Sequence, residues 1–214
     1  MFRAMLPSTI PLFPLPNAVL FPNVFMPLHI FESRYRAMVA DALAGDRIIG
    51  MVLLKAGFEA DYEGRPPVYP VGCAGLITHS EPLPDGRYNI VLKGIEKFRV
   101  TGEDSSRAYR LASVAPMPES IGDDERSELH RLRLRLEALL VAAVEREGAE
   151  PKFPPAVADE DLVNALAQFI GLEPLERQAL LERDGVVPRC HALIELLGMK
   201  TMARGTTWRG SGVH

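Results

Sequence analysis

Short apolar runs alternate with prolines at the start of the chain. Between Ile10 and Tyr35 the sequence reads IPLFPLPNAVLFPNVFMPLHIFESRY. Proline fixes φ and removes a backbone donor, so it is found at strand starts, sheet edges and turns. The pattern therefore predicts a ribbon of short extended pieces over residues 9–28, joined by tight corners. We expect its apolar side chains to cover more than one wall of a core.

Helical spacing of apolar residues replaces this pattern after the ribbon. One stripe at i, i+3, i+4, i+7 and i+8 predicts an amphipathic helix, and it consists of Tyr35, Met38, Val39, Ala42 and Leu43. Glu32 or Ser33 is expected to cap the start of the helix, and Phe31 to pack down on its first turn. We expect the helix to end at Gly45.

Apolar or alternating runs between glycine and proline turns then predict a series of strands. We expect these strands at residues 48–55, 71–80, 87–92, 97–101 and 109–115. Residues 74–93 should form a hairpin, and residues 56–68 a polar loop. Gly72 and Gly75 are expected to mark bends or a bulge, and Gly94 to separate two strands. Short, closely spaced strands of this kind indicate a small closed or half-closed barrel.

Helical periodicity dominates the rest of the chain, after a break in composition at MPESIGDD, residues 117–124. Leucine stripes predict a long helix that ends near Gly148, a helix from Asp159 to Gly171, another opened by Pro174, and a last one opened by Pro188. In the second of these helices one side should carry Leu162, Leu166, Phe169 and Ile170.

The predicted fold class is therefore α+β, with an amino-terminal β-barrel that carries one helix, followed by a carboxy-terminal α-helical bundle. The predicted domains are the barrel at 1–118, the bundle at 119–203 and a flexible tail at 204–214, with a proline-rich linker at 150–157 inside the bundle. Nothing in the sequence explains Trp208 in the tail.

Composition places the chain among soluble globular proteins, with 47% hydrophobic and 24% charged residues in 214. The net charge of −4 argues against a nucleic acid as the main partner, because phosphate binding needs a basic surface. The start of the chain lacks the continuous apolar region of a signal peptide. No run of about 18 apolar residues predicts a transmembrane helix. We expect a cytoplasmic protein with no membrane partner.

The residues that could carry chemistry form no catalytic constellation. None of the histidines has a neighbour at HxxxH or HExxH spacing, and Ser33 does not lie in a nucleophile elbow. Cys73 and Cys190 are far apart and belong to no metal-binding pattern, so we expect reduced, buried thiols, with a lone disulfide as the alternative. The acidic runs 123–125 and 159–161 lie at helix starts, where the helix dipole favours them. We therefore predict no catalytic residue, no metal and no cofactor.

One basic run interrupts the long helix and comprises His130, Arg131, Arg133 and Arg135. Glu128 and Glu137 can pair with it at helical spacing. We favour a solvated helix face over a patch for RNA or phosphate.

The opening motif resembles the amino-terminal substrate-binding domain of Lon proteases, which reads as an LPLFPL run, an FP corner and PLHIFE-x-RY. A second segment that matches the family is DGRYNIVLKG at 85–94, followed by Phe98, and a looser one is Val71, Gly72 and Ile77. Lys97 stands where the family usually has arginine, and Ser33 where it often has proline. The resemblance covers roughly residues 9–200 and implies a PUA-like β-barrel followed by a helical bundle.

What the resemblance implies about function is recognition without catalysis. The chain has no GxxxxGK[ST] loop and ends before a protease domain could begin, so it looks like a stand-alone recognition domain. We expect a non-enzymatic protein that binds exposed or unfolded polypeptide segments, for substrate recognition or as an adaptor. The alternatives are an RNA-binding PUA-like protein and a small-molecule-binding protein that uses the crevice between barrel and bundle.

The candidate peptide-binding residues come from the opening motif, and they are Phe13, Phe21, Phe25, Met26, Glu32, Arg34 and Tyr35. The aromatic residues and the methionine would form an exposed apolar patch, and the others its rim. The alternative is structural. In that case the apolar residues are core, Tyr35 packs, and Glu32 caps the helix or pairs with Arg34, Arg99 or Lys97.

Overall fold

The computed structural model describes residues 6–58, 65–145 and 157–207, with side chains described up to residue 142 in the first of the two long helices and up to 201 in the second. Several predicted features fall outside these residues. They are the middle of the loop at 59–64, the helix end near Gly148, most of the linker at 150–157, and Trp208.

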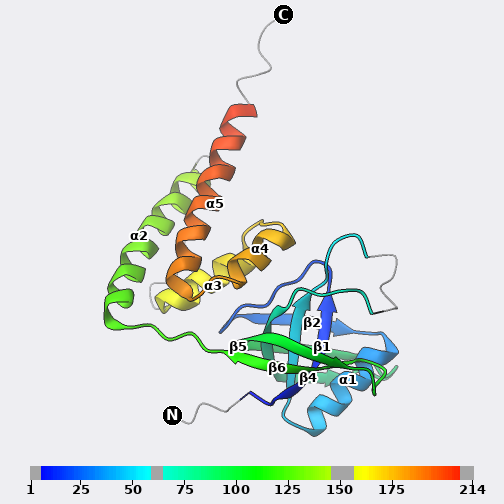
Figure 1. Cartoon of the computed structure of the whole chain (residues 1–214). Coiled ribbons are helices and arrows are strands. Elements are labelled where there is room, and N and C mark those ends of the chain that lie inside the picture. Colours follow the sequence, from blue (N-terminus) through cyan, green and yellow to red (C-terminus); the bar gives the residue numbers. More distant parts are fainter. Residues whose placement is uncertain (1–5, 59–64, 146–156, 208–214) are drawn as a thin grey trace, which may run out of the picture. The chain divides into compact units, whose positions relative to one another are not determined.

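A mixed sheet and helices form an α+β fold (Figure 1). The strands are β1 (Thr9–Leu15), β2 (Phe25–Ile30), β3 (Ile48–Leu53), β4 (Val71–Pro82), β5 (Tyr88–Asp104) and β6 (Arg110–Met117). They form a 6-stranded sheet in the order β2-β5-β4-β3-β1-β6, and β6 also pairs with β5. The pairing therefore runs in a closed ring through β5, β4, β3, β1 and β6, with β2 attached to β5 on the outside.

The proline-punctuated ribbon supplies β1 and β2, as its pattern predicts. β1 pairs parallel with β3 and antiparallel with β6, so it lies between two strands and its apolar residues are enclosed. The core around it contains Ile10, Leu12, Val52, Phe98 and Ala112, each nearly or fully buried. Burial of the isoleucine, leucine, valine and phenylalanine side chains contributes roughly 1.5–3 kcal/mol each, so this core stabilises the ring of strands.

Helix α1 (Ser33–Ala44) follows β2 directly. It starts after Glu32 and ends at Gly45, whose N–H donates to the carbonyl of Ala42 at 3.1 Å, so both predicted ends are confirmed. The predicted contact of Phe31 with the first turn is wrong, because this side chain is 63% exposed.

Two glycine predictions for the sheet have different outcomes. The pairing of β4 with β5 shifts register between Ala74 and Gly75, which confirms the predicted bulge. The predicted strand break at Gly94 is wrong, because β5 runs without interruption from Tyr88 to Asp104. Gly94 is required by close packing instead. A Cβ atom at this position would lie 2.0 Å from the carbonyl oxygen of Phe21.

The helices of the second half are α2 (Asp123–Glu145), α3 (Asp159–Phe169), α4 (Pro174–Leu181) and α5 (Val186–Thr207). α2 and α5 lie side by side (Figure 1). Acidic residues fill the first turns of α2 and α3, where their negative charge interacts favourably with the positive end of the helix dipole. Glu173 and Glu176 form a capping box at the start of α4. Because α5 runs to Thr207, residues 204–207 continue the helix where a tail is predicted.

Contacts divide the chain into two compact units, which we call unit 1 and unit 2. Unit 1 comprises Met1–Glu119 and Asn164–Glu182, and unit 2 comprises Ser120–Val163 and Arg183–His214. The chain thus leaves unit 1 next to the predicted boundary at 118. Residues 164–182, which the sequence assigns to the helical bundle, group with the sheet in unit 1.

Among the described residues, no helix has both the length and the apolar character needed to cross a bilayer.

Candidate functional site

Three of the candidate residues are core residues of unit 1. Phe13, Phe21 and Tyr35 are 6%, 0% and 4% exposed. The rings of Phe13 and Tyr35 pack with their centroids 4.4 Å apart. These side chains have almost no surface to offer a partner, so their assignment to a peptide-binding patch is corrected, and the structural alternative holds for them.

Glu32 and Arg34 pair with each other on the surface of unit 1. The Nε atom of Arg34 donates to Oε2 of Glu32 at 3.0 Å, and the Arg34 guanidinium lies 4.6 Å from the centroid of the Tyr35 ring. The Glu32 side chain makes no capping hydrogen bond to the helix. The pair with Arg34 is one that the structural alternative anticipates, and both side chains remain half-buried.

Phe25 is the exposed aromatic residue among the candidates, with 52% of its surface accessible, whereas Met26 is half-buried. The difference follows from the period-2 geometry of a strand. Along β2 exposure alternates, so Phe25, Pro27 and His29 share the outer side. Phe31 continues that side beyond the strand, since its ring stacks on the His29 ring with a centroid distance of 6.3 Å.

These residues and their neighbours on β5 define a surface that we call the β2 face. It consists of Phe25, Pro27, His29, Phe31, Asn89, Val91 and Lys93. Phe25 lies opposite Lys93 in register, Pro27 opposite Val91, and His29 opposite Asn89. The Lys93 ammonium is 5.8 Å from the centroid of the Phe25 ring. The face therefore combines exposed aromatic rings with one cation at the Phe25 end.

A row of hydrogen bonds organises the other end of the β2 face. His29 Nδ1 lies 2.8 Å from Oδ1 of Asn89, whose amide in turn donates to Glu81 at 2.9 Å. Arg87 Nη1 lies 3.2 Å from His29 Nε2. Since arginine can only donate, Nε2 must accept, and the His29 proton resides on Nδ1, where it is donated to Asn89. This row fixes the ring orientation of an exposed histidine.

Arg87 is itself held by a carboxylate in the turn between β4 and β5. The Nε atom of Arg87 donates to Asp85 Oδ2 at 2.6 Å. This hydrogen bond is the main reason that the pKa of Asp85 lies below its usual value and the pKa of Arg87 above its usual value. Both groups therefore stay charged at neutral pH and compensate each other.

Polar side chains of α3 hold the start of β2 in place. Gln168 accepts from the Phe21 N–H at 3.0 Å and donates to the Phe25 carbonyl at 3.3 Å. Asn164, one helical turn earlier, donates to the Pro22 carbonyl at 3.1 Å. Both amides are buried. Apolar periodicity alone does not identify these two residues, although polar residues at i and i+4 within an apolar helix are a usable signal for such a role.

Because Asn164 and Gln168 are buried, the buried side of α3 differs from the predicted one. The apolar stripe predicts Phe169 on the same side as Leu162, but Phe169 is 67% exposed, whereas Val163 and Ala167 are buried. The buried side of α3 is thus the one that carries Asn164 and Gln168, whose amides bind the ribbon. Phe169 adds an exposed aromatic side chain to unit 1.

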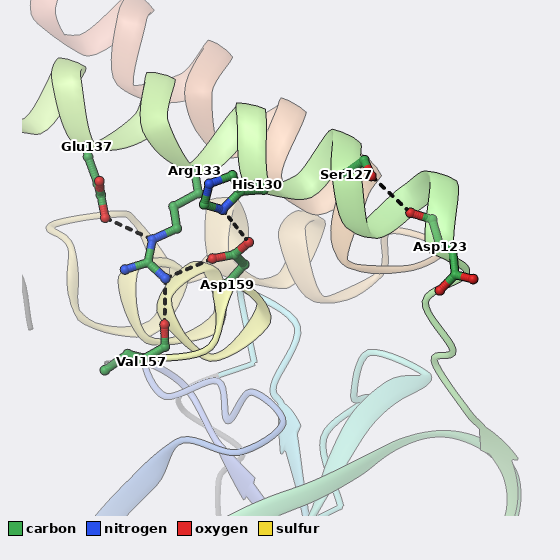
Figure 2. A network of polar contacts seen from close by, with 7 residues as sticks. All are labelled: Asp123, Ser127, His130, Arg133, Glu137, Val157 and Asp159. Atoms are coloured by element: carbon green, nitrogen blue, oxygen red, sulfur yellow. Dashed lines mark hydrogen bonds and ion pairs between the residues drawn. The ribbon is translucent and has the colours of Figure 1, made fainter. Parts of the chain in front are cut away.

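Two residues of the basic run of α2, His130 and Arg133, belong to a polar network in unit 2 (Figure 2). Arg133 is 9% exposed and donates to Glu137, Asp159 and the Val157 carbonyl. His130 lies 3.1 Å from the other oxygen of Asp159. The acceptors raise the pKa of Arg133, with the Asp159 hydrogen bond as the largest cause. Arg133 therefore joins α2 to the start of α3 and is not available to a phosphate.

The rest of that run remains on the surface. Arg131 and Arg135 are exposed, as a solvated face predicts. Of the acidic residues expected to pair with the run, Glu137 does so. Glu128 instead lies 3.0 Å from Nε2 of His191.

Both cysteines are buried, and neither forms a disulfide, as predicted. Burial is the main cause that raises the pKa of the Cys190 thiol to about 12, and the Asp159 carboxylate adds to it. Thiolate is the reactive form of cysteine.

In a Cys73→Ala variant at pH 8, we expect Ellman's reagent to modify Cys190 at least about a hundredfold more slowly in native protein than in urea. Equal rates would contradict the burial of this thiol.

One small pocket lies in unit 1, between the start of β1 and the end of α1, with a volume of about 170 Å³. Asp41 in its wall accepts a hydrogen bond of 2.6 Å from the Tyr109 hydroxyl and lies 3.3 Å from Arg107. This carboxylate is thus already engaged by neighbouring side chains. Within the described residues, no group of three His, Cys, Asp or Glu side chains is arranged to hold a metal ion.

Comparisons with known proteins agree on one family. The sequence model of the ATP-dependent protease La (LON) substrate-binding domain matches residues 9–198. The Lon protease of Flavobacterium johnsoniae is 26% identical over 192 residues, which is 86% of this chain and 23% of that protein. Lon protease 2 of Myxococcus xanthus is 26% identical over 203 residues, or 91% of this chain and 24% of that protein. The chain therefore spans about a quarter of the length of the curated relatives it matches.

Solved structures show the same fold. The N-terminal domain of Mycobacterium avium complex Lon protease superposes with a TM-score of 0.63 at 20% identity, covering 89% of this chain and 98% of that one. A Lon N-terminal domain protein from Xanthomonas campestris gives a TM-score of 0.60 at 22% identity, covering 88% and 98%. At these identities the likeness concerns the fold alone.

Proposed function

The chain belongs to the family of ATP-dependent protease La (LON) substrate-binding domains, and from this membership we propose that it recognises exposed or unfolded polypeptide segments through the β2 face. The observation that carries this proposal is the exposure of Phe25 and Phe31, at 52% and 63%, on one side of a strand whose neighbours are fixed by hydrogen bonds. Large aromatic side chains on a surface are characteristic of interaction sites.

The chemistry of the β2 face supports a polypeptide as the ligand. Its aromatic rings can pack against apolar side chains that a folded protein would bury, and Lys93 can attract a carboxylate beside them. The net charge of −4 favours a polypeptide over a nucleic acid. We propose that the chain acts by binding alone, as a substrate-recognition or adaptor protein in the cytoplasm, without hydrolytic chemistry of its own.

We further propose that the fold is a PUA-like β-barrel followed by a helical bundle. The closed ring of pairing through β5, β4, β3, β1 and β6 supports a PUA-like β-barrel. The helices of the second half support a bundle. The division of the chain at 118 and 203 stays a prediction.

The proposal is tested with a permanently unfolded protein. Reduced, carboxymethylated α-lactalbumin carrying a fluorophore should bind the wild-type chain in an anisotropy titration. Replacing Phe31 by serine should weaken the affinity about tenfold, and the Phe25→Ser/Phe31→Ser pair about fiftyfold or more, because each removes a large apolar contact.

A matched control is Phe58→Ser, which removes an aromatic residue of similar exposure, 45%, from the loop after β3. Its affinity should stay within about twofold of wild type. Equal losses for Phe58→Ser and Phe31→Ser would indicate nonspecific adhesion, and no binding by the wild type would refute the proposed function.

A further inference from the structure

β2 is the open edge of the sheet. In the described part of the chain it is the strand that has a single neighbour, β5, whereas the others are paired on both sides by the ring. An open edge presents unpaired N–H and C=O groups, and an extended peptide can bind by adding a strand there. The direction of these groups along β2 decides whether that is feasible.

Two hydrogen bonds establish which residues of β2 point their backbone groups outward. The Gly94 N–H donates to the Val24 carbonyl at 2.9 Å. Paired and unpaired positions alternate in an antiparallel ladder. The backbone N–H and C=O groups of Met26 and Leu28 therefore point toward β5, and the backbone groups of Phe25, Pro27 and His29 point toward the edge. A second hydrogen bond supports this assignment, because the Thr78 hydroxyl of β4 donates to the carbonyl of Val91 at 3.1 Å. The Val91 carbonyl, opposite Pro27, therefore points toward β4 and away from β2.

The outward row is blocked at two places. Pro27, at its centre, has no N–H to donate. The carbonyl of Phe25, at its start, already accepts from Nε2 of Gln168 at 3.3 Å, so a side chain of α3 covers that end of the edge. Proline and a covering helix are the devices by which proteins protect sheet edges from strand addition.

Resting on the proposed function, we infer that a bound polypeptide is held through its side chains on the β2 face and not as a strand added to the β2 edge. The ligand class follows from this mode. It comprises extended segments with alternate aromatic, aliphatic or proline side chains, and binding does not depend on their backbone N–H groups. Proline-containing segments are therefore bound as well as those without proline.

Backbone methylation of a peptide ligand tests the inference. An array of fragments from reduced, carboxymethylated α-lactalbumin gives the tightest-binding unmodified fragment. This fragment is resynthesised twice, with N-methyl groups at the odd or at the even residues of its central stretch. An added strand exposes one of these sets to β2 and the other to solvent.

If side chains hold the ligand, both methylated peptides should bind within about threefold of the parent, and Phe25→Ser/Phe31→Ser should weaken all three alike. If only one of the two methylated peptides loses affinity, by tenfold or more, while the other binds like the parent, the inference is overturned and the proposed function remains intact. Absence of binding by every unmodified fragment would refute the proposed function, and the inference with it.

Discussion

Replacing Lys97 by methionine should lower the free energy of unfolding by about 3 kcal/mol, because it breaks a buried ion pair. The Lys97 side chain is 2% exposed, and its Nζ lies 2.7 Å from Oε1 of Glu119, which is 17% exposed. The same ammonium donates to the carbonyl of Leu181 at 3.2 Å. The variant removes the cation from beside a mostly buried carboxylate and takes a donor from a buried carbonyl.

Both contacts of Lys97 lie where the chain passes out of unit 1. Glu119 is the last residue of its first segment, and Leu181 precedes Glu182 at the end of its second. The lysine therefore holds both segment ends against β5 from within unit 1. A point donor suits this geometry, because the two acceptors belong to different segments, whereas the fork of arginine suits a single carboxylate.

Urea unfolding followed by circular dichroism measures the effect. Lys93→Met is the matched control, since Lys93 lies on the same strand but is half-buried on the β2 face, and it should change stability by less than about 0.5 kcal/mol. The double variant with Glu119→Gln should be more stable than the sum of the single effects predicts, because the pair is coupled. Equal stability of the Lys97 and Lys93 variants would show that the ion pair contributes nothing.

Local patterns in the sequence are sufficient to predict most elements of the fold. The stripe from Tyr35 to Leu43 identifies α1 because helical periodicity is a property of consecutive residues. Gly45 marks its end by the same local logic. The prolines of the ribbon place β1 and β2, since a missing N–H restricts where a strand can pair.

Contacts between distant segments are what the sequence does not reveal. Phe169 satisfies the apolar stripe of α3, yet it is exposed because Asn164 and Gln168 turn their own side toward the backbone of residues 21–25. Their partners lie about 140 residues away in sequence, as the separation of 147 between Phe21 and Gln168 illustrates. Periodicity counts apolar side chains and cannot weigh buried amides whose acceptors belong to another segment.

The candidate site shows the same limit. Phe13 and Phe25 look alike in the motif, but β1 lies within the ring of strands and β2 outside it. The Phe13 side chain is therefore in the core, and the Phe25 side chain is on the surface. Phe31 does not stand out in the sequence as a surface residue, because an apolar residue before a helix usually packs down on the first turn. The pairing of β2 with β5 keeps it beside His29 instead. Strand order, which decides exposure here, is set by long-range pairing.

The ribbon crosses β5 at Gly94, where the two backbones are in close contact. Replacing Gly94 by alanine should destabilise the protein by about 3 kcal/mol or more, because overpacking against backbone cannot be relieved by a side-chain rotation. The added Cβ would lie 2.0 Å from the carbonyl oxygen of Phe21 and 2.8 Å from its carbonyl carbon. To make room, the ribbon would have to give up hydrogen bonds between Gly94 and Asn23 and Val24, at 2.8 and 2.9 Å.

Gly102→Ala provides a matched control on the same strand, since a Cβ there meets nothing within 4 Å. It should leave stability within about 1 kcal/mol of wild type, because the lost freedom of the unfolded chain offsets other costs. Thermal unfolding should then show a fall of roughly 6–12 °C for Gly94→Ala and little change for Gly102→Ala. Since the residues that Gly94 supports lead directly into β2, Gly94→Ala should also weaken binding of unfolded α-lactalbumin at temperatures where the variant is still folded. A folded variant with wild-type affinity would separate the ribbon crossing from the β2 face.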